Sequence, residues 1–219
     1  MRSFRTKRAG RRVLDAPPRC HACGLVAALA LCLATGPGRP VEAADTDGNF
    51  AIKGGGVQPC SALLTAHDRK SDDLGLYAGW IDGYLTGLNQ FSPQTYDLAT
   101  WQGSDTLLSM TRAVCQQMPP DTRVLEAFLQ IVRAIQPGRL QQEEGLVALL
   151  HNGKGTAIYG SILITAKTRL NALGHQAGAE DTAFTEATAL AFQRFQKAEG
   201  LAETGLPDQQ TLYRLLRLP

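Results

Sequence analysis

The sequence predicts an all-α protein in which two small helical domains follow a leader. Apolar residues recur every three or four positions through most of the chain after residue 56, and this is the spacing of a buried helix face. Pro119-Pro120 and Pro137-Gly138 interrupt that pattern, as expected where helices end. A pair of cysteines, Cys60 and Cys115, lies within the first of the two patterned regions. We therefore expect a disulfide-stapled helical domain followed by a three-helix domain.

Residues 1–43 have the order of a secretory signal peptide. Seven arginines and lysines occur in the first nineteen residues, ten apolar residues follow from Leu25 to Ala34, and small residues surround Ala43. The apolar run covers about half of a hydrocarbon core, so it is too short for a permanent membrane span. We expect cleavage near Ala43 and a periplasmic or secreted protein. A retained membrane anchor is the alternative.

Removal of the leader would change both the charge and the cysteine count. The full chain has a formal net charge of +2, whereas residues 44–219 contain 14 basic and 18 acidic residues, a net charge of −4. This balance argues against nucleic acid as a partner. Of five cysteines only Cys60 and Cys115 would remain, and such a pair most simply forms a disulfide in an oxidising compartment. A catalytic thiol is the competing interpretation.

The first helical domain is expected over residues 56–136, after a polar, glycine-rich and flexible start at residues 44–55. Proline is tolerated in a first helical turn, so Pro59 can open a helix. Ser71 is a suitable N-cap for the next helix. The predicted helices begin at Pro59 and then cover residues 71–89, 104–118 and 121–135.

Four glycines repeat at every fourth position of the second predicted helix, at residues 75, 79, 83 and 87. Each glycine costs a helix interior up to about 1 kcal/mol relative to alanine. A bare ridge of this kind needs a physical reason, and close approach of another helix would supply one. The sequence therefore predicts tight helix packing along these glycines.

The second domain is expected over residues 158–219, after a linker at residues 137–157 that contains a short helix or strand. Its buried face is predicted to include Phe192 and Phe195, because aromatic residues at helical spacing are usually core residues. The predicted helices cover residues 158–173 and 185–198, and a final one begins at Pro207.

The residues of this second domain follow a known pattern. Its positions are Leu170, Leu173-Gly174, Asp181, Phe184, Thr188, Ala191, Phe195-Gln196, Gly200-Leu201, Thr204-Gly205, Asp208, Thr211 and Leu215. The segment resembles the peptidoglycan-binding-like module that is attached to bacterial wall hydrolases and transpeptidases. The resemblance implies a three-helix fold and peptidoglycan as a partner. The sequence departs from the pattern at Ala166-Lys167, Thr182 and Thr185.

If a glycan or stem peptide binds this module, polar groups around the turn at residues 176–184 are the candidates. Each candidate also has a structural interpretation, because aspartates and threonines cap helices and phenylalanines fill cores. The candidate peptidoglycan-binding residues are Gln176, Asp181, Phe184, Thr188 and Gln196.

The first domain carries a second resemblance. Cys60 heads a short helix, the motif Trp80-Ile-Asp-Gly-Tyr-Leu-Thr-Gly87 follows, and Cys115 precedes Pro119-Pro120. This order resembles the small secreted Rap/Tai-like family, over residues 56–136. Named members are periplasmic immunity proteins that block type VI secretion amidases, so the resemblance implies a protein partner. This chain has a single cysteine pair in this domain, where immunity members tend to have more.

No pattern of catalytic or cofactor-binding residues is present. His67, His151 and His175 lack the spacing of a zinc site, and nucleophile elbows, phosphate loops and dinucleotide fingerprints are missing. We expect no metal, no cofactor and no enzymatic activity. The leading hypothesis is a protein that binds peptidoglycan through its second domain and a partner, such as a wall enzyme, through its first. The alternatives are a protein-interaction or immunity-like protein without wall binding, and a small wall hydrolase with unrecognised acids.

Overall fold

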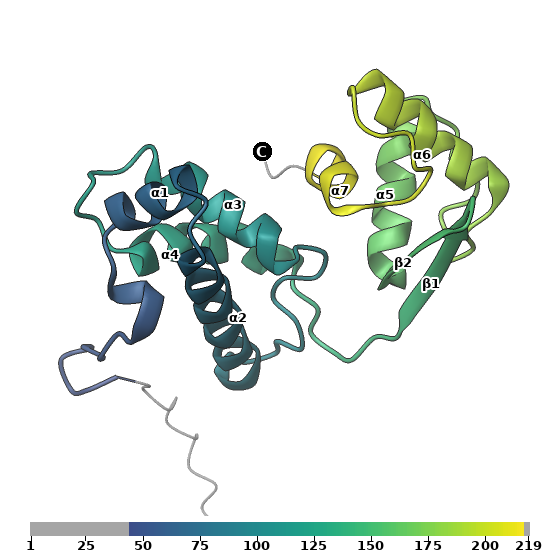
Figure 1. The fold of residues 1–219 in the computed structure, drawn as a ribbon. Coiled ribbons are helices and arrows are strands. Elements are labelled where there is room, and N and C mark those ends of the chain that lie inside the picture. Colours follow the sequence, from purple (N-terminus) through teal and green to yellow (C-terminus); the bar gives the residue numbers. More distant parts are fainter. Residues whose placement is uncertain (1–43, 217–219) are drawn as a thin grey trace, which may run out of the picture. The chain divides into compact units, whose positions relative to one another are not determined.

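The computed structural model describes residues 44–216, so the predicted leader and its cleavage site lie outside the described residues. Residues 49–219 cluster as one compact unit. Within it we distinguish a helical lobe (residues 49–140) and a C-terminal module (residues 146–216). Figure 1 labels the elements in chain order.

The helical lobe is formed by four α-helices, as the apolar spacing predicted. They are α1 (Cys60–Asp68), α2 (Asp73–Phe91), α3 (Ser104–Cys115) and α4 (Val124–Ile135), with short 3-10 turns η1 (Gly54–Val57) and η2 (Gln136–Gly138) before and after them. The most amphipathic is α4, and Phe128 at its centre is fully buried. The rings of Trp80 and Tyr84 from α2 meet the Phe128 ring edge-on, at centroid distances of 6.1 and 6.0 Å. The predicted boundaries differ from the observed ones by at most three residues.

The predicted disulfide is present and joins the first residue of α1 to the last residue of α3. The Cα atoms of Cys60 and Cys115 are 5.2 Å apart, and both side chains are buried. The backbone reinforces this connection, because the Cys60 N–H donates to the Thr122 carbonyl at 2.7 Å and the Val124 N–H donates to Gln58 at 2.9 Å. The start of α1 is therefore fixed both to α3 and to the segment that leads into α4.

The prediction of close helix packing along the α2 glycines is wrong. A Cβ atom added at residue 75, 79, 83 or 87 would have no neighbour within 4 Å. The buried contacts of α2 come instead from Tyr77, Ile81 and Leu85, which lie on the other side of the helix. The close glycine approach occurs elsewhere, at Gly56, where an added Cβ would overlap the Trp80 ring.

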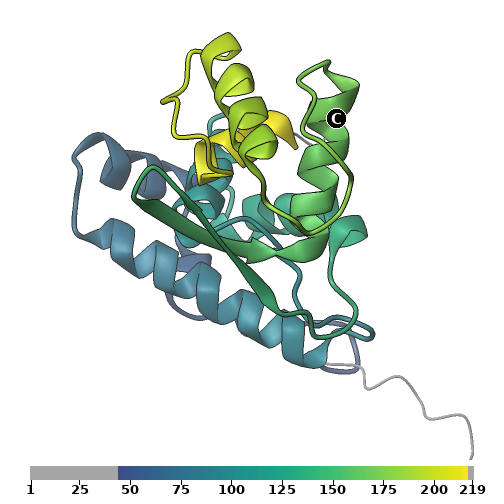
Figure 2. The ribbon, with the colours of Figure 1, turned by 90° about the vertical axis from the view of Figure 1, so that its right-hand side faces the viewer.

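The all-α prediction holds for most of the described chain, but it omitted a β-hairpin. Strands β1 (Leu146–His151) and β2 (Lys154–Tyr159) pair antiparallel, with Leu146 opposite Tyr159 and His151 opposite Lys154. The turn residues Asn152 and Gly153 have φ angles of 50° and 73°, as expected for an Asn-Gly hairpin turn. This hairpin occupies most of the stretch expected to be a linker, and it leads directly into α5 (Figure 2).

The C-terminal module adds three helices to the hairpin, and its core includes residues from all of these elements. The helices are α5 (Gly160–Ala172), α6 (Glu186–Ala198) and α7 (Gln209–Leu215). Phe192 and Phe195 are buried, as predicted. Leu149 of β1 and Ile158 of β2 belong to the same core cluster. The hairpin is therefore part of the module, and the module begins about a dozen residues before the predicted boundary.

Candidate functional site

The candidate loop (residues 175–185) connects α5 to α6 and is held in place by Lys167. The side chain of Lys167 is only 1% exposed, although it carries a charge. Its Nζ donates to Asp181 Oδ1 at 2.7 Å, to the Asp181 carbonyl at 3.2 Å and to the Ala183 carbonyl at 2.9 Å. A buried ammonium group needs such partners because desolvation without them is very costly. Lys167 therefore anchors this loop to α5.

Asp181 has a structural role in this arrangement although it remains accessible. Its side chain is 55% exposed, and Oδ1 also accepts the Ala183 N–H at 3.1 Å. The hydrogen bond from Lys167, followed by that from the Ala183 N–H, lowers the pKa of Asp181. Both bonds favour the ionised carboxylate. The negative charge at this position is therefore compensated within the loop.

Thr188 is buried and helps to cap α6, so it is not on a ligand-accessible surface. Thr185 is the N-cap and accepts the Thr188 N–H at 3.3 Å, and the two side chains form a capping box. The Thr188 hydroxyl donates to the Ala177 carbonyl at 3.0 Å. Thr185, one of the departures from the family pattern, thus supplies the cap that the helix needs.

Gln196 is also fully buried, at the centre of a polar network that folds the segment between α6 and α7. Its Oε1 accepts the Gly205 N–H at 2.9 Å, and its Nε2 lies 2.9 Å from Thr204 Oγ1, Thr211 Oγ1 and the Leu206 carbonyl. Asp208 accepts both threonine hydroxyls at 2.8 Å and caps α7. These groups satisfy one another, so the structure assigns Gln196 to the fold.

Three of the five candidate residues remain at the surface, and all three are on the candidate loop. Gln176 is exposed and has a φ of 51°, Asp181 is exposed, and Phe184 is partly buried against the module core. The sequence predicted this turn as the candidate surface, and these three side chains are at least partly exposed there. It could not separate them from Thr188 and Gln196, because burial depends on the packing of α6 against the rest of the module.

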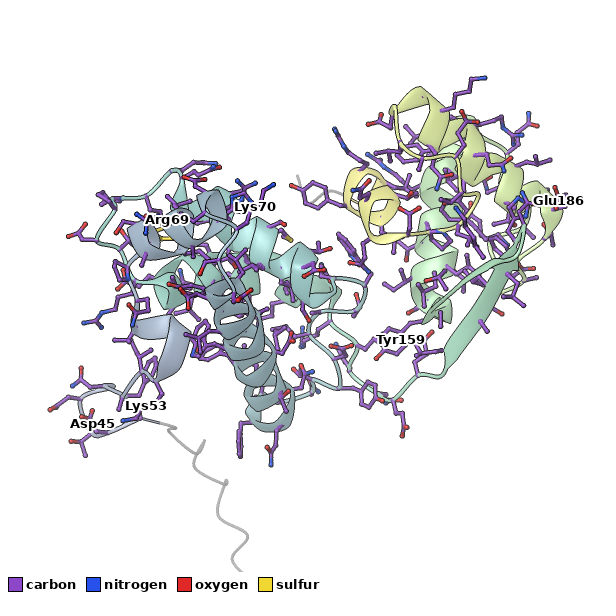
Figure 3. The ribbon with its side chains drawn as sticks, in the orientation of Figure 1. Asp45, Lys53, Arg69, Lys70, Tyr159 and Glu186 are labelled. Carbon is purple, nitrogen blue, oxygen red and sulfur yellow. A yellow bond between two sulfur atoms is a disulfide. The ribbon has the colours of Figure 1, made fainter. Side chains whose placement is uncertain are left out.

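A further polar cluster, missed from the sequence, lies at the end of the hairpin. The side chain of His151 is 9% exposed, and its Nε2 is 3.0 Å from Asn152 Nδ2 and 3.3 Å from Gln193 Nε2. The other ring nitrogen, Nδ1, lies 3.8 Å from Oε2 of Glu186, the α6 residue labelled in Figure 3. The cluster fastens the hairpin to α6. Its only sequence signal was the Asn-Gly turn that brings His151 to this end.

The helical lobe and the C-terminal module contact each other through Gln209 at the start of α7. Its Oε1 accepts from the Gly103 N–H and the Thr106 hydroxyl at 2.8 Å, and its Nε2 donates to the Trp101 carbonyl at 2.6 Å. Trp101 also packs against the module core. These residues are separated by about a hundred positions in the chain, so no sequence pattern indicated the contact.

A second polar contact involves Tyr159 at the end of β2, labelled in Figure 3. Its hydroxyl donates to Asp97 Oδ2 at 3.0 Å. Burial, and then the hydrogen bond and the negative charge of Asp97, raise the pKa of Tyr159 to about 12. Asp97 is itself positioned by the Asn89 amide at 3.4 Å and by a backbone bridge to Leu140. The contact therefore holds the start of the module against an ordered part of the lobe.

The part of the chain that the structure describes contains neither a cluster of potential metal ligands nor a helix that could span a membrane. Among residues 44–216, no three histidine, cysteine, aspartate or glutamate side chains gather as a possible metal-ligand set. Over the same residues, no helix combines the length and the apolar content that crossing a membrane requires.

Comparison with known proteins finds a family match within the C-terminal module. Residues 159–215 match the family model described as "Putative peptidoglycan binding domain". The matched segment begins at the last residue of β2 and ends at the last residue of α7, and it supports peptidoglycan as a partner of this chain. No curated protein and no solved structure matches the chain.

Proposed function

We propose that this is a non-enzymatic periplasmic protein that docks on peptidoglycan through its C-terminal module and engages a protein partner through its helical lobe. The family match over residues 159–215 is the observation that supports docking on peptidoglycan. A closed polar network around Gln196 and a buried Lys167 keep the module's loops in one conformation. Preformed loops favour binding because less conformational entropy is lost.

The candidate loop is the part of the module that we propose to contact the wall polymer. It presents Gln176 and Asp181 to solvent beside the partly buried ring of Phe184, a combination suited to a sugar with polar edges and an apolar face. Sedimentation with insoluble peptidoglycan tests both this surface and the module as a whole. We expect the protein to enter the pellet and Gln176→Ala to enter it less. Gln90→Ala, at an exposed position of α2, is the control.

We propose that the protein partner binds the helical lobe at α2. Leu76 and Phe91 are 58% and 75% exposed, and they belong to the same helix as the four unpacked glycines. Large exposed apolar side chains on one helix favour association with another protein. The resemblance of this lobe to amidase immunity proteins makes a wall enzyme the partner that we expect. Cross-linking at residue 76 in cells should capture such an enzyme, and no specific adduct should form at the control position 133.

The absence of enzymatic activity is also part of the proposal. The candidate acids of a hydrolase have other positions or roles in this structure. Asp72 and Asp73 are exposed at the start of α2. Glu144 accepts the Ser161 N–H at 2.6 Å, which is a structural contact. A gel that contains wall material should show no clearing around the protein. A cleared band that disappears on mutation of one of these acids would favour a small wall hydrolase instead.

A further inference from the structure

The α3–α7 groove is a concave surface of about 840 Å³ that is separate from the candidate loop. Most of its lining residues come from the length of α3 and from α7, and they include Asp105, Ser109, Arg112, Tyr213 and Arg214. A volume of this size is within the range of small-molecule sites. The hydrogen bonds of Gln209 to Trp101, Gly103 and Thr106 fix the two walls to each other.

Arg112 supplies a cation whose guanidinium has no ion-pair partner in the described part of the chain. Its Nε is buried and has no hydrogen-bond partner, and among residues 44–216 no carboxylate forms an ion pair with its guanidinium. Buried polar atoms are nearly always hydrogen-bonded in folded proteins. A guanidinium presents several donors in a planar fork, which matches the two oxygens of a carboxylate. The missing partner of Arg112 is therefore best explained by an anionic ligand.

Other lining residues strengthen this expectation. Arg214 is only loosely paired, since its Nη1 is 3.9 Å from Glu199, and its side chain is 43% exposed. Two arginines and one aspartate are the charged residues of the groove, so it is positive within a chain whose residues 44–219 carry a net charge of −4. The ring of Tyr213 is 42% exposed and provides an apolar surface beside these charges.

We propose that the α3–α7 groove binds the carboxylate-bearing stem peptide of peptidoglycan, with Arg112 as the principal anchor and Arg214 as the second. This inference rests on the proposed function, because it assigns a ligand class to a protein that docks on the wall. The stem peptide carries free carboxylates on a chain short enough to enter the groove, whereas the N-acetylated sugars are uncharged at their amides. The site combines residues of both the lobe and the module, so neither part contains it alone.

The test is a binding titration with muropeptides released from purified wall by a muramidase. A second preparation, from which an amidase has removed the stem peptides, provides the stem-free glycan. Wild-type protein should bind the first at least tenfold more tightly than the second, which can still contact the candidate loop and carries only the lactyl carboxylate that the amidase exposes on muramic acid. Loss of one charge-assisted contact should weaken binding of the first by about ten- to a hundredfold in Arg112→Gln. Arg112→Lys should recover only part of it, because lysine lacks the bidentate fork.

Two controls keep the result interpretable. Arg133→Gln removes an exposed arginine of α4 outside the groove and should bind as wild type does. Arg214→Gln replaces a more exposed groove residue, so a severalfold loss is expected even if Arg112→Gln does not fold. Wild-type affinity in both groove variants, or equal binding of stem-free glycan, overturns this inference. Failure of the protein to sediment with intact wall overturns the proposed function itself.

Discussion

Replacement of Gln196 by leucine should destabilise the module without removing a surface contact. Leucine is similar in size but has no polar atom. The hydroxyls of Thr204 and Thr211 would still donate to Asp208, and the Leu206 carbonyl would still accept the Asp208 N–H at 2.9 Å. Only the Gly205 N–H, buried and now bonded to Gln196 Oε1, would lose its acceptor.

The expected loss of stability follows from these lost hydrogen bonds. One orphaned buried N–H costs about 1–3 kcal/mol, and the lost glutamine bonds add roughly 1 kcal/mol more, so the free energy of unfolding should fall by about 2–4 kcal/mol. Urea unfolding followed by circular dichroism measures this change. Gln90→Leu, at an exposed position of α2, should change stability by less than about 0.5 kcal/mol. A Gln196→Leu protein that is fully stable but no longer binds the wall would refute the structural role and restore Gln196 as a ligand residue.

Three further predictions concern the ionisable groups and the disulfide. Because Lys167 lowers the pKa of Asp181, this carboxylate stabilises the fold above about pH 4, and the contribution is lost as the pH falls through its folded pKa. The urea midpoint should therefore drop more between pH 5 and pH 3 in wild type than in Lys167→Met. The pKa of Tyr159 is raised to about 12, so stability should decline as the pH rises from about 10 to about 12. In an ultraviolet titration, Tyr159→Phe should lack the last ionisation step, and an unchanged curve would contradict the assignment. Replacing both Cys60 and Cys115 by alanine should lower the free energy of unfolding by about 4 kcal/mol, and intact-mass analysis of oxidised wild-type residues 44–219 should find two alkylatable thiols only after reduction.

The helices and the disulfide could be predicted because their signals are local or compositional. Apolar residues three and four positions apart located α4, and the removal of leader cysteines from the count left Cys60 and Cys115 as the pair. The hairpin was underestimated although Asn152-Gly153 is a strong turn signal. Its strands are short, and a short apolar run such as residues 146–150 does not distinguish a strand from a helix by periodicity.

The remaining errors concern contacts between elements. The α2 glycines have the spacing of a helix-packing ridge, but spacing alone does not state whether a neighbour exists, and here none lies within 4 Å of the added Cβ positions. Thr188 and Gln196 matched the family pattern because the pattern records residues that build the fold as well as residues that could bind. The Gln209 contacts and the unpaired Arg112 depend on segments that the folded chain brings together from about a hundred residues apart.

Sedimentation of the protein with purified, insoluble peptidoglycan tests the central claim most directly. The account predicts that the pelleted fraction rises with the amount of wall material and saturates, and that an excess of soluble muropeptides reduces it. Recovery in the pellet that is the same with and without wall material would contradict the claim that this protein binds peptidoglycan.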